Sequence, residues 1–184
     1  MATVRAGKRG VLVVVDAQVG VLQGTWKASE VVENIALAVE KARRAGVPII
    51  WVQHSDDELA YGSPEWQLTP DLRPAEGETQ IFKQFNSSFE QTNLEETLAR
   101  LGATQIVLAG AATNWCIRAT AYGALERGYD LTLIKDAHTT GSMEFENGDR
   151  IEAEDIIREL NIAMKWLSYP GRTNGVAVAA EVDF

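Results

Sequence analysis

The chain has 184 residues, of which 46% are hydrophobic and 23% charged, and its net charge is −9. This length is sufficient for one apolar core, and we expect residues 1–184 to form a single domain. The acidic balance argues against a nucleic-acid-binding surface. Apolar runs such as residues 11–15 (VLVVV) are too short to cross a membrane, and the N-terminal sequence is a poor match to a signal peptide.

The first predicted strand covers residues 10–16 (GVLVVVD), which are continuously apolar up to the aspartate, as in a strand buried on both faces. Residues 29–45 have apolar positions at helical spacing, and Gly46 and Pro48 end this predicted helix. Residues 47–53 (VPIIWVQ) predict a second buried strand. Residues 55–78 are rich in glycine and proline and predict a long loop of the kind that often serves function.

The rest of the chain continues the alternation of strands and helices. The further predicted elements are a strand near 80–83, a helix at about 93–101, a strand at 105–109, a helix containing Cys116 that runs to about 126, a strand at 130–135, a helix at about 150–167 capped by Asp149, and a last strand at 174–178. The apolar C-terminal sequence GVAVAAEVDF is expected to pack on the domain or on a second subunit.

This alternation predicts parallel βαβ units and an α/β fold of three layers, α/β/α, around a central, mostly parallel, Rossmann-like sheet. In such folds ligands bind beyond the carboxyl ends of the strands. The polar residues that fall at these predicted ends are Asp16, Gln53, His54, Lys83 and the segments 110–116 and 136–138.

The only cysteine, Cys116, lies in a predicted strand-to-helix turn. A single cysteine cannot form an internal disulfide, so its thiol is free and a reducing cytoplasm is the expected compartment. A helix N-terminus can stabilise a thiolate, and its free N–H groups can hold an oxyanion. The alternative is that Cys116 is a small buried apolar residue.

A cysteine nucleophile needs a base, and two charged residues are placed to assist it. Asp16 could take the thiol proton, and Lys83 could orient the carboxylate and help to hold the thiolate. Taken separately, Asp16 could cap a turn and Lys83 could be a solvated side chain. Their joint placement at strand ends favours a catalytic set.

Three stretches with these residues carry a family resemblance: VLVVVDAQ with Asp16, FKQFNSSF with Lys83, and LAGAATNWCIRATA with Cys116. The segments DAHTT at 136–140 and GSPEWQL at 62–68 add to it. The chain resembles the isochorismatase-like cysteine hydrolases, which include nicotinamidases and N-carbamoylsarcosine amidohydrolase. The resemblance covers nearly the whole chain in order and spacing.

The resemblance implies an Asp16–Lys83–Cys116 triad that cleaves a C–N bond of a small amide, carbamoyl or lactam-like compound through a thioester. It also implies a cis peptide bond between Ala111 and Ala112. The backbone N–H groups of Ala112 and Cys116 would then form the oxyanion hole.

Departures from relatives narrow these expectations. Nicotinamidases hold a metal with one aspartate and two histidines near the second strand, whereas this chain has Val52 and a single histidine, His54, in that region. We therefore expect no metal and no cofactor. Isochorismatases that cleave a vinyl ether lack the nucleophilic cysteine, so Cys116 argues against that reaction.

Further residues are candidates for substrate binding: Gln18, His54, Trp66 and Phe89. Each has a structural alternative, as a turn cap, a structural hydrogen-bonding group or a core aromatic. The partner we expect is a small-molecule amide, and we expect the chain to form a homo-oligomer, a dimer or a tetramer. Two alternatives remain: a non-catalytic binding or thiol-sensing protein on the same fold, and a vinyl-ether hydrolase.

Overall fold

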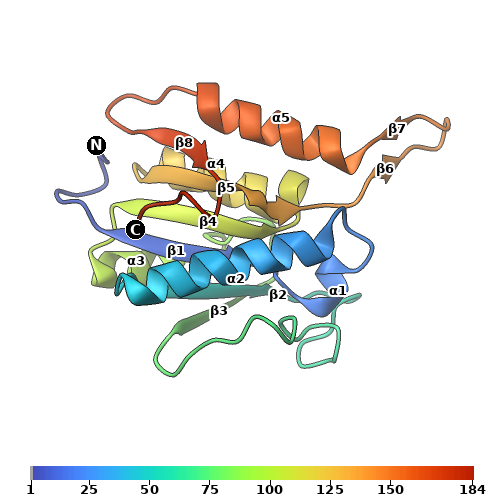
Figure 1. Ribbon diagram of the computed structural model, residues 1–184, viewed down its shortest axis with the longest axis horizontal. Helices are drawn as coiled ribbons and strands as arrows, with labels where there is room; N and C mark the ends of the chain where they lie inside the picture. Colours follow the sequence, from blue (N-terminus) through green and yellow to red (C-terminus); the bar gives the residue numbers. More distant parts are fainter. Residues whose placement is uncertain (1) are drawn as a thin grey trace.

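A parallel sheet forms the centre of the protein, in a computed structural model that describes residues 2–184 (Figure 1). Its six strands have the order β3-β2-β1-β4-β5-β8, and each neighbouring pair is parallel. The strands are β1 (Gly10–Val15), β2 (Ile49–His54), β3 (Thr79–Lys83), β4 (Gln105–Ala111), β5 (Asp130–Thr139) and β8 (Asn174–Ala177). This arrangement confirms the predicted α/β fold.

Helices cover both faces of this sheet. They are α1 (Val19–Leu22), α2 (Ala28–Arg44), α3 (Leu94–Leu101), the π-helical turn η1 (Thr113–Ile117), α4 (Arg118–Glu126) and α5 (Ala153–Trp166). Figure 1 shows α2 crossing in front of the strands, with α4 behind them and α5 beside β8. The apolar side chains of α2 belong to one core cluster, and those of α3, α4 and α5 to another. The sheet is therefore the middle of three layers.

The strand β1 shows why the central strands are continuously apolar. Val11, Val13 and Val15 pack into the cluster on one face, whereas Leu12 and Val14 pack into the other. Successive side chains of a strand point to opposite faces, so a strand covered on both sides needs an apolar residue at every position. Each fully buried valine or leucine contributes about 1.5–3 kcal/mol to folding.

A close backbone contact joins β4 to the end of β1. Gly110 pairs with Val15, and the ladder between β4 and β5 is irregular between Leu108 and Gly110. Gly110 has a φ of 126°, and a Cβ atom at this position would lie 1.9 Å from the carbonyl oxygen of Val15. Only glycine fits there, and the close approach brings the chain after β4 beside the residue after Val15.

The segment before α5 differs from the prediction. A small hairpin of β6 (Met143–Glu144) and β7 (Arg150–Ile151) occupies the beginning of the predicted helix, and α5 starts only at Ala153. The prediction that Asp149 caps this helix is therefore wrong, because Asp149 lies in the hairpin turn and the N-cap is Glu152. The tight turn within this connection covers residues 145–148 and is closed by the hydrogen bond from the Gly148 N–H to the Phe145 carbonyl oxygen, with Gly148 at a φ of 84°.

Two further segments are fixed to the sheet. Residues 65–69 of the long loop run beside the segment after β1, through hydrogen bonds that join Thr69 to Ala17 and Gln67 to Val19. The C-terminal stretch adds β8 to the sheet beside β5. The prediction left open whether the stretch packs on the domain or on a second subunit, and the structure shows it packed on the domain. Within residues 2–184, no helix combines the length and the apolar character needed to cross a membrane.

Candidate active site

Asp16 directly follows β1 and lies at the carboxyl edge of the sheet. Its backbone has a φ of 50°, in the left-handed region that aspartate tolerates better than most residues. This conformation ends the strand and changes the direction of the chain. The residue is only 1% exposed, so its carboxylate is removed from bulk solvent.

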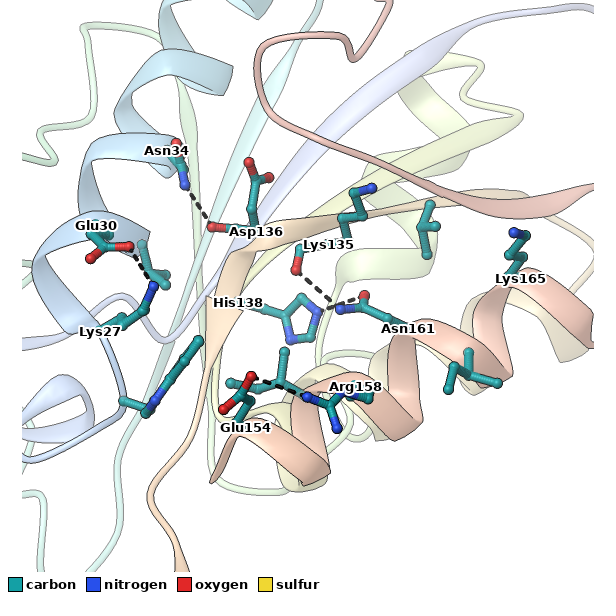
Figure 2. A pocket seen from close by; sticks show the side chains of 15 residues that line it. Lys27, Glu30, Asn34, Lys135, Asp136, His138, Glu154, Arg158, Asn161 and Lys165 are labelled. Carbon is teal, nitrogen blue, oxygen red and sulfur yellow. Dashed lines mark hydrogen bonds and ion pairs between the residues drawn. The ribbon is translucent and has the colours of Figure 1, made fainter. Parts of the chain in front are cut away.

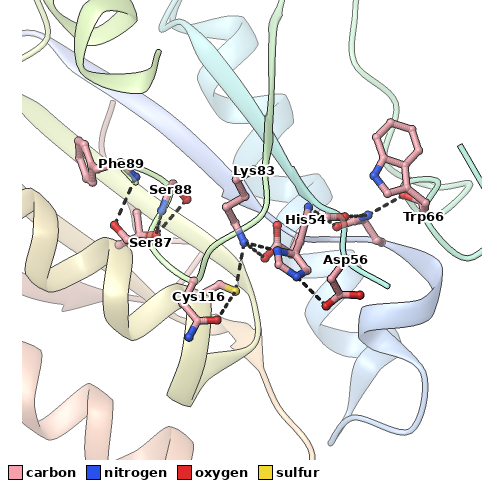
Figure 3. A network of polar contacts seen from close by, with 12 residues as sticks. His54, Asp56, Trp66, Lys83, Ser87, Ser88, Phe89 and Cys116 are labelled. Atoms are coloured by element: carbon pink, nitrogen blue, oxygen red, sulfur yellow. Dashed lines mark hydrogen bonds and ion pairs between the residues drawn. The ribbon is translucent and has the colours of Figure 1, made fainter. Parts of the chain in front are cut away.

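Lys83 is the last residue of β3, and its ammonium group lies against the Asp16 carboxylate. Figure 3 shows Lys83 between His54 and Cys116. Lys83 Nζ is 2.7 Å from Asp16 Oδ2, 3.2 Å from Cys116 Sγ and 3.4 Å from His54 Nδ1. Its side chain is 0% exposed. The structure thus brings Asp16, Lys83 and Cys116 together, as their positions at strand ends predicted.

Cys116 is the fourth residue of η1, the π-helical turn between β4 and α4. Two backbone N–H groups of this turn, those of Trp115 and Ile117, donate to the carbonyl oxygen of Ala112 and so fix its shape. The preceding peptide bond, between Ala111 and Ala112, is cis. Cys116 is 7% exposed, so its sulfur lies just beneath the surface.

The protonation state of the thiol differs from the expectation of a stabilised thiolate. Burial, followed by the negative charge of Asp16, raises the pKa of Cys116 to about 12, although Lys83 opposes this shift. Burial also raises the pKa of Asp16 and outweighs the opposing charge of Lys83. At neutral pH the proton therefore rests on the sulfur, and a carboxylate of raised basicity lies beside it.

The side chain of Gln18 forms hydrogen bonds within the protein. Its Nε2 donates to the carbonyl oxygens of His54, at 2.9 Å, and of Trp66, at 2.8 Å. Its Oε1 accepts from the backbone N–H of His54 at 2.8 Å. Gln18 is 0% exposed, and these hydrogen bonds join the end of β2 to the long loop. The structure thus gives Gln18 a structural role in place of the predicted substrate contact.

The rings of Trp66 and Phe89 also serve packing. Trp66 lies in an aromatic cluster with Tyr61 and Phe82, at centroid distances of 4.5 and 5.4 Å. Phe89 packs against Tyr129, at 6.3 Å, on the α4 side of the sheet. Figure 3 shows both rings turned away from the sulfur of Cys116. The structure therefore places neither ring against the thiol of Cys116.

His54 lies beside the buried ion pair, at the end of β2. Its Nδ1 faces Lys83 Nζ, and its Nε2 is 2.9 Å from Asp56 Oδ2. Its side chain is 16% exposed. Of the four predicted substrate-binding residues, His54 is therefore the one that the structure places at the site.

Two residues near the thiol were missed by the sequence analysis. Asn86 Oδ1 lies 3.9 Å from Cys116 Sγ, on an exposed turn three residues after Lys83. Asp56 contacts His54. The available signal was proximity in sequence, because Asn86 belongs to the FKQFNSSF stretch and Asp56 follows His54 by two residues.

His138 contacts η1 through a hydrogen bond with Thr113. Its Nε2–H donates to Asn161 Oδ1 at 3.1 Å, so Nδ1 accepts from the Thr113 hydroxyl at 2.9 Å. Burial lowers the pKa of His138 to about 4, which keeps the ring neutral at neutral pH. His138 lines a groove of about 490 Å³ between α2 and α5 (Figure 2). Neither Cys116 nor Asp16 lines this groove.

The described residues contain no cluster of three or more histidine, cysteine, aspartate or glutamate side chains placed to hold a metal ion. The fold and the site define a class of protein: a three-layer α/β protein with a carboxylate, an ammonium group and a thiol buried together at the carboxyl edge of its sheet.

Comparisons with known proteins agree with this class. The family model described as the isochorismatase domain matches residues 10–152. A secreted isochorismatase effector from Verticillium dahliae is 35% identical over 69% of this chain and 70% of its own length. A ureidoacrylate amidohydrolase from Methylobacterium radiotolerans is 31% identical over 60% of this chain and 56% of its own. The crystal structure of an isochorismatase from Pseudomonas putida, 30% identical, superimposes with a TM-score of 0.83 over 97% of this chain and 93% of its own.

The chain therefore belongs to the isochorismatase family of hydrolases.

Proposed function

We propose that this protein is a cysteine hydrolase that cleaves a C–N bond of a small amide, carbamoyl or lactam-like compound. The observation that carries the proposal is the position of Lys83 Nζ, within hydrogen-bond distance of both Asp16 Oδ2 and Cys116 Sγ in a buried site. A relative that is an amidohydrolase by name supports the C–N bond as the target.

In the first half of the proposed reaction Asp16 accepts the thiol proton as the sulfur attacks the carbonyl carbon. This proton transfer matches the resting state, in which the thiol holds the proton beside a carboxylate of raised pKa. The N–H groups of Ala112 and Cys116 would stabilise the oxyanion. Asp16 then donates the proton to the departing nitrogen, the C–N bond breaks, and an acyl thioester of Cys116 remains.

In the second half Asp16 removes a proton from a water molecule, and the resulting hydroxide attacks the thioester carbon. The C–S bond breaks, the carboxylic acid leaves, and the thiolate regains the proton held by Asp16. Lys83 Nζ lies within hydrogen-bond distance of three acceptors, which are Asp16 Oδ2, Cys116 Sγ and His54 Nδ1. Its role is to hold the carboxylate and the sulfur in place while charge moves between them.

The test is to screen small amides for ammonia release and to search for an acyl adduct on Cys116 by mass spectrometry. We expect Cys116→Ala to reduce turnover by at least about a thousandfold, because the nucleophile is lost. The control is Ser142→Ala, a hydroxyl of the β6–β7 region that contacts Glu152. Full activity of Cys116→Ala would contradict the proposal and favour vinyl-ether hydrolysis. A thiol that binds ligands without turnover would favour a binding or sensing protein.

A further inference from the structure

We propose that His54 and Asp56 are positioning residues for the thiol: His54 Nδ1 accepts the third hydrogen bond of Lys83 Nζ, and Asp56 holds the imidazole in the tautomer that can accept it. Their importance for catalysis rests on the proposed function, whereas the tautomer of His54 can be measured without it. Neither side chain is placed in hydrogen-bond contact with Cys116 Sγ, so both would act through Lys83.

The first argument is the number of donors on Lys83. An ammonium group has three N–H donors and no acceptor, and its side chain here is 0% exposed. Asp16 and Cys116 accept two of the three hydrogen bonds. His54 Nδ1, at 3.4 Å, is the third acceptor, and without it a buried donor of a charged group would be unsatisfied.

The second argument is the tautomer. An imidazole nitrogen accepts a hydrogen bond only when it carries no proton, so His54 Nδ1 must be bare where it faces Lys83. The opposite nitrogen, Nε2, lies 2.9 Å from Asp56 Oδ2. A carboxylate only accepts, so Nε2 carries the proton. Asp56 therefore selects the tautomer that Lys83 needs.

The third argument is that Asp56 is itself fixed and charged. Its Oδ1 accepts from the backbone N–H groups of Leu59, at 2.7 Å, and Glu58, at 2.9 Å. The hydrogen bond from His54 and then that from Leu59 lower the pKa of Asp56, which keeps it ionised. The charged groups that face His54 are Lys83 at the end of β3, Asp56 in the loop after β2 and Asp16 directly after β1.

These contacts form one continuous chain from the surface to the sulfur. Asp56 is 48% exposed, His54 is 16% exposed and Lys83 is 0% exposed. Lys83 reaches both Asp16 and Cys116 only while its ammonium group stays between them. His54 Nδ1 is the one contact of Lys83 Nζ found among the described residues besides those with Asp16 and Cys116.

The first test compares His54→Leu with His54→Asn, since these two side chains have nearly the same size and differ in polarity. The readout is the rate of iodoacetamide alkylation of Cys116 at a series of pH values. We expect His54→Leu to slow alkylation about tenfold, the equivalent of one lost hydrogen bond. His54→Asn, whose amide oxygen can replace Nδ1, should keep most of the rate. Equal rates for the two variants would show that His54 only fills space and would overturn the proposal.

The second test is Asp56→Asn. If Oδ1 of the new asparagine keeps its backbone contacts, its NH₂ group faces His54 Nε2. Nε2 must then accept a hydrogen bond, so the proton of the imidazole moves to Nδ1. The Nδ1–H group would face the Lys83 ammonium group and could not accept from it. We expect alkylation to slow about tenfold here as well. Loss of a nearby negative charge would by itself lower the thiol pKa and speed alkylation. An unchanged or faster rate would therefore overturn the proposal.

The third measurement reads the tautomer directly and separates this proposal from the proposed function. Nitrogen NMR of isotope-labelled histidine should show the proton of His54 on Nε2 and none on Nδ1, as the contacts of the two nitrogens require. The chain has two histidines, and the spectrum of His54→Asn assigns the signals. A ring protonated at Nδ1, or at both nitrogens, would overturn the proposal whatever the activity. Absence of any thioester would overturn the proposed function and leave the NMR result standing.

Discussion

At the scale of single residues, the site holds two opposite charges and one neutral thiol in a volume that water barely reaches. The Asp16 carboxylate and the Lys83 ammonium group are nearly completely buried, and each is stabilised by the other. Such a pair is costly to leave half-formed, because removing one partner leaves an uncompensated buried charge. The state of Cys116 therefore depends on both neighbours together.

Replacement of Asp16 by asparagine should separate thiol ionisation from catalysis. The Asp16 charge contributes to the raised pKa of Cys116, and Lys83 opposes it. In Asp16→Asn only the cation remains, so we expect the thiol pKa to fall by roughly one unit or more, which increases the thiolate fraction about tenfold at a fixed pH below the pKa. Amide hydrolysis should nevertheless be lost, because the proposed base is absent.

Ultraviolet absorbance of the thiolate as a function of pH measures this shift. The matched control is Asp71→Asn, an exposed carboxylate on the long loop. A thiol pKa that stays the same or rises in Asp16→Asn would contradict the electrostatic account of the site.

The sequence allowed prediction of the Asp16, Lys83 and Cys116 cluster because parallel strands end at a common edge, so residues after their last apolar position meet there. The role of Gln18 could not be predicted in this way. It follows Asp16, whose left-handed backbone turns the chain out of the strand direction, and no period-2 pattern applies beyond that point. Trp66 depends in the same way on a loop conformation that local patterns do not specify.

At the scale of elements, the apolar runs in the sequence predicted the strands of the sheet. The conformations of the segments that connect the strands could not be predicted in this way. Residues 143–151 contain an Asn-Gly turn signal that favours a hairpin over the first turn of a helix. The π-helical form of η1 was not predicted, because π-helices are rare and occur mostly as single turns within an α-helix. Its shape depends on the position of β4 beside β1.

Gly110 is the position where that dependence can be tested. A methyl group there would overlap the carbonyl of Val15, and the backbone has a φ that other residues rarely adopt. We expect Gly110→Ala to lower the free energy of unfolding by about 3 kcal/mol or more and to slow alkylation of Cys116, because η1 is displaced from Asp16.

Urea denaturation of the variant gives the stability change. The control is Gly175→Ala in β8, where an added Cβ meets no atom within 4 Å. A Gly110→Ala variant as stable as this control would refute the claim that the close contact positions the site.

At the scale of the whole molecule, His138 connects three parts of the fold that surround the site. It lies in β5, contacts η1 through Thr113 and contacts α5 through Asn161. Asn161 in turn donates to the carbonyl oxygen of Lys135 in β5. The imidazole at the centre of these contacts is buried and neutral. Because its protonation is unfavourable in the folded protein, we expect the free energy of unfolding to fall at acidic pH.

The pKa of His138 is about 4 in the folded protein, whereas the ordinary histidine value of 6.5 applies to the unfolded chain. Above pH 6.5 neither state binds the proton, and below it the unfolded chain binds the proton first, so stability falls as the pH falls from 6.5 to about 4. Between pH 7 and pH 5 we expect a loss of about 2 kcal/mol from this residue.

Urea denaturation at both pH values measures the loss. In His138→Gln the ring is absent, so the variant should be less stable at pH 7 but should lose less on acidification than the natural sequence. An identical pH dependence in the two proteins would show that His138 is not the residue responsible.

The sequence contains one cysteine, and it lies at the site itself, so chemical modification of the thiol reports directly on the site. A thiol-specific reagent that adds one mass increment to the intact chain has modified the centre of the site, and the relative heights of the two mass peaks give the fraction of molecules that have reacted. A fluorophore or spin label introduced there would need no prior removal of other thiols. Ligand binding could then be followed as protection of a single atom, even before any product is known.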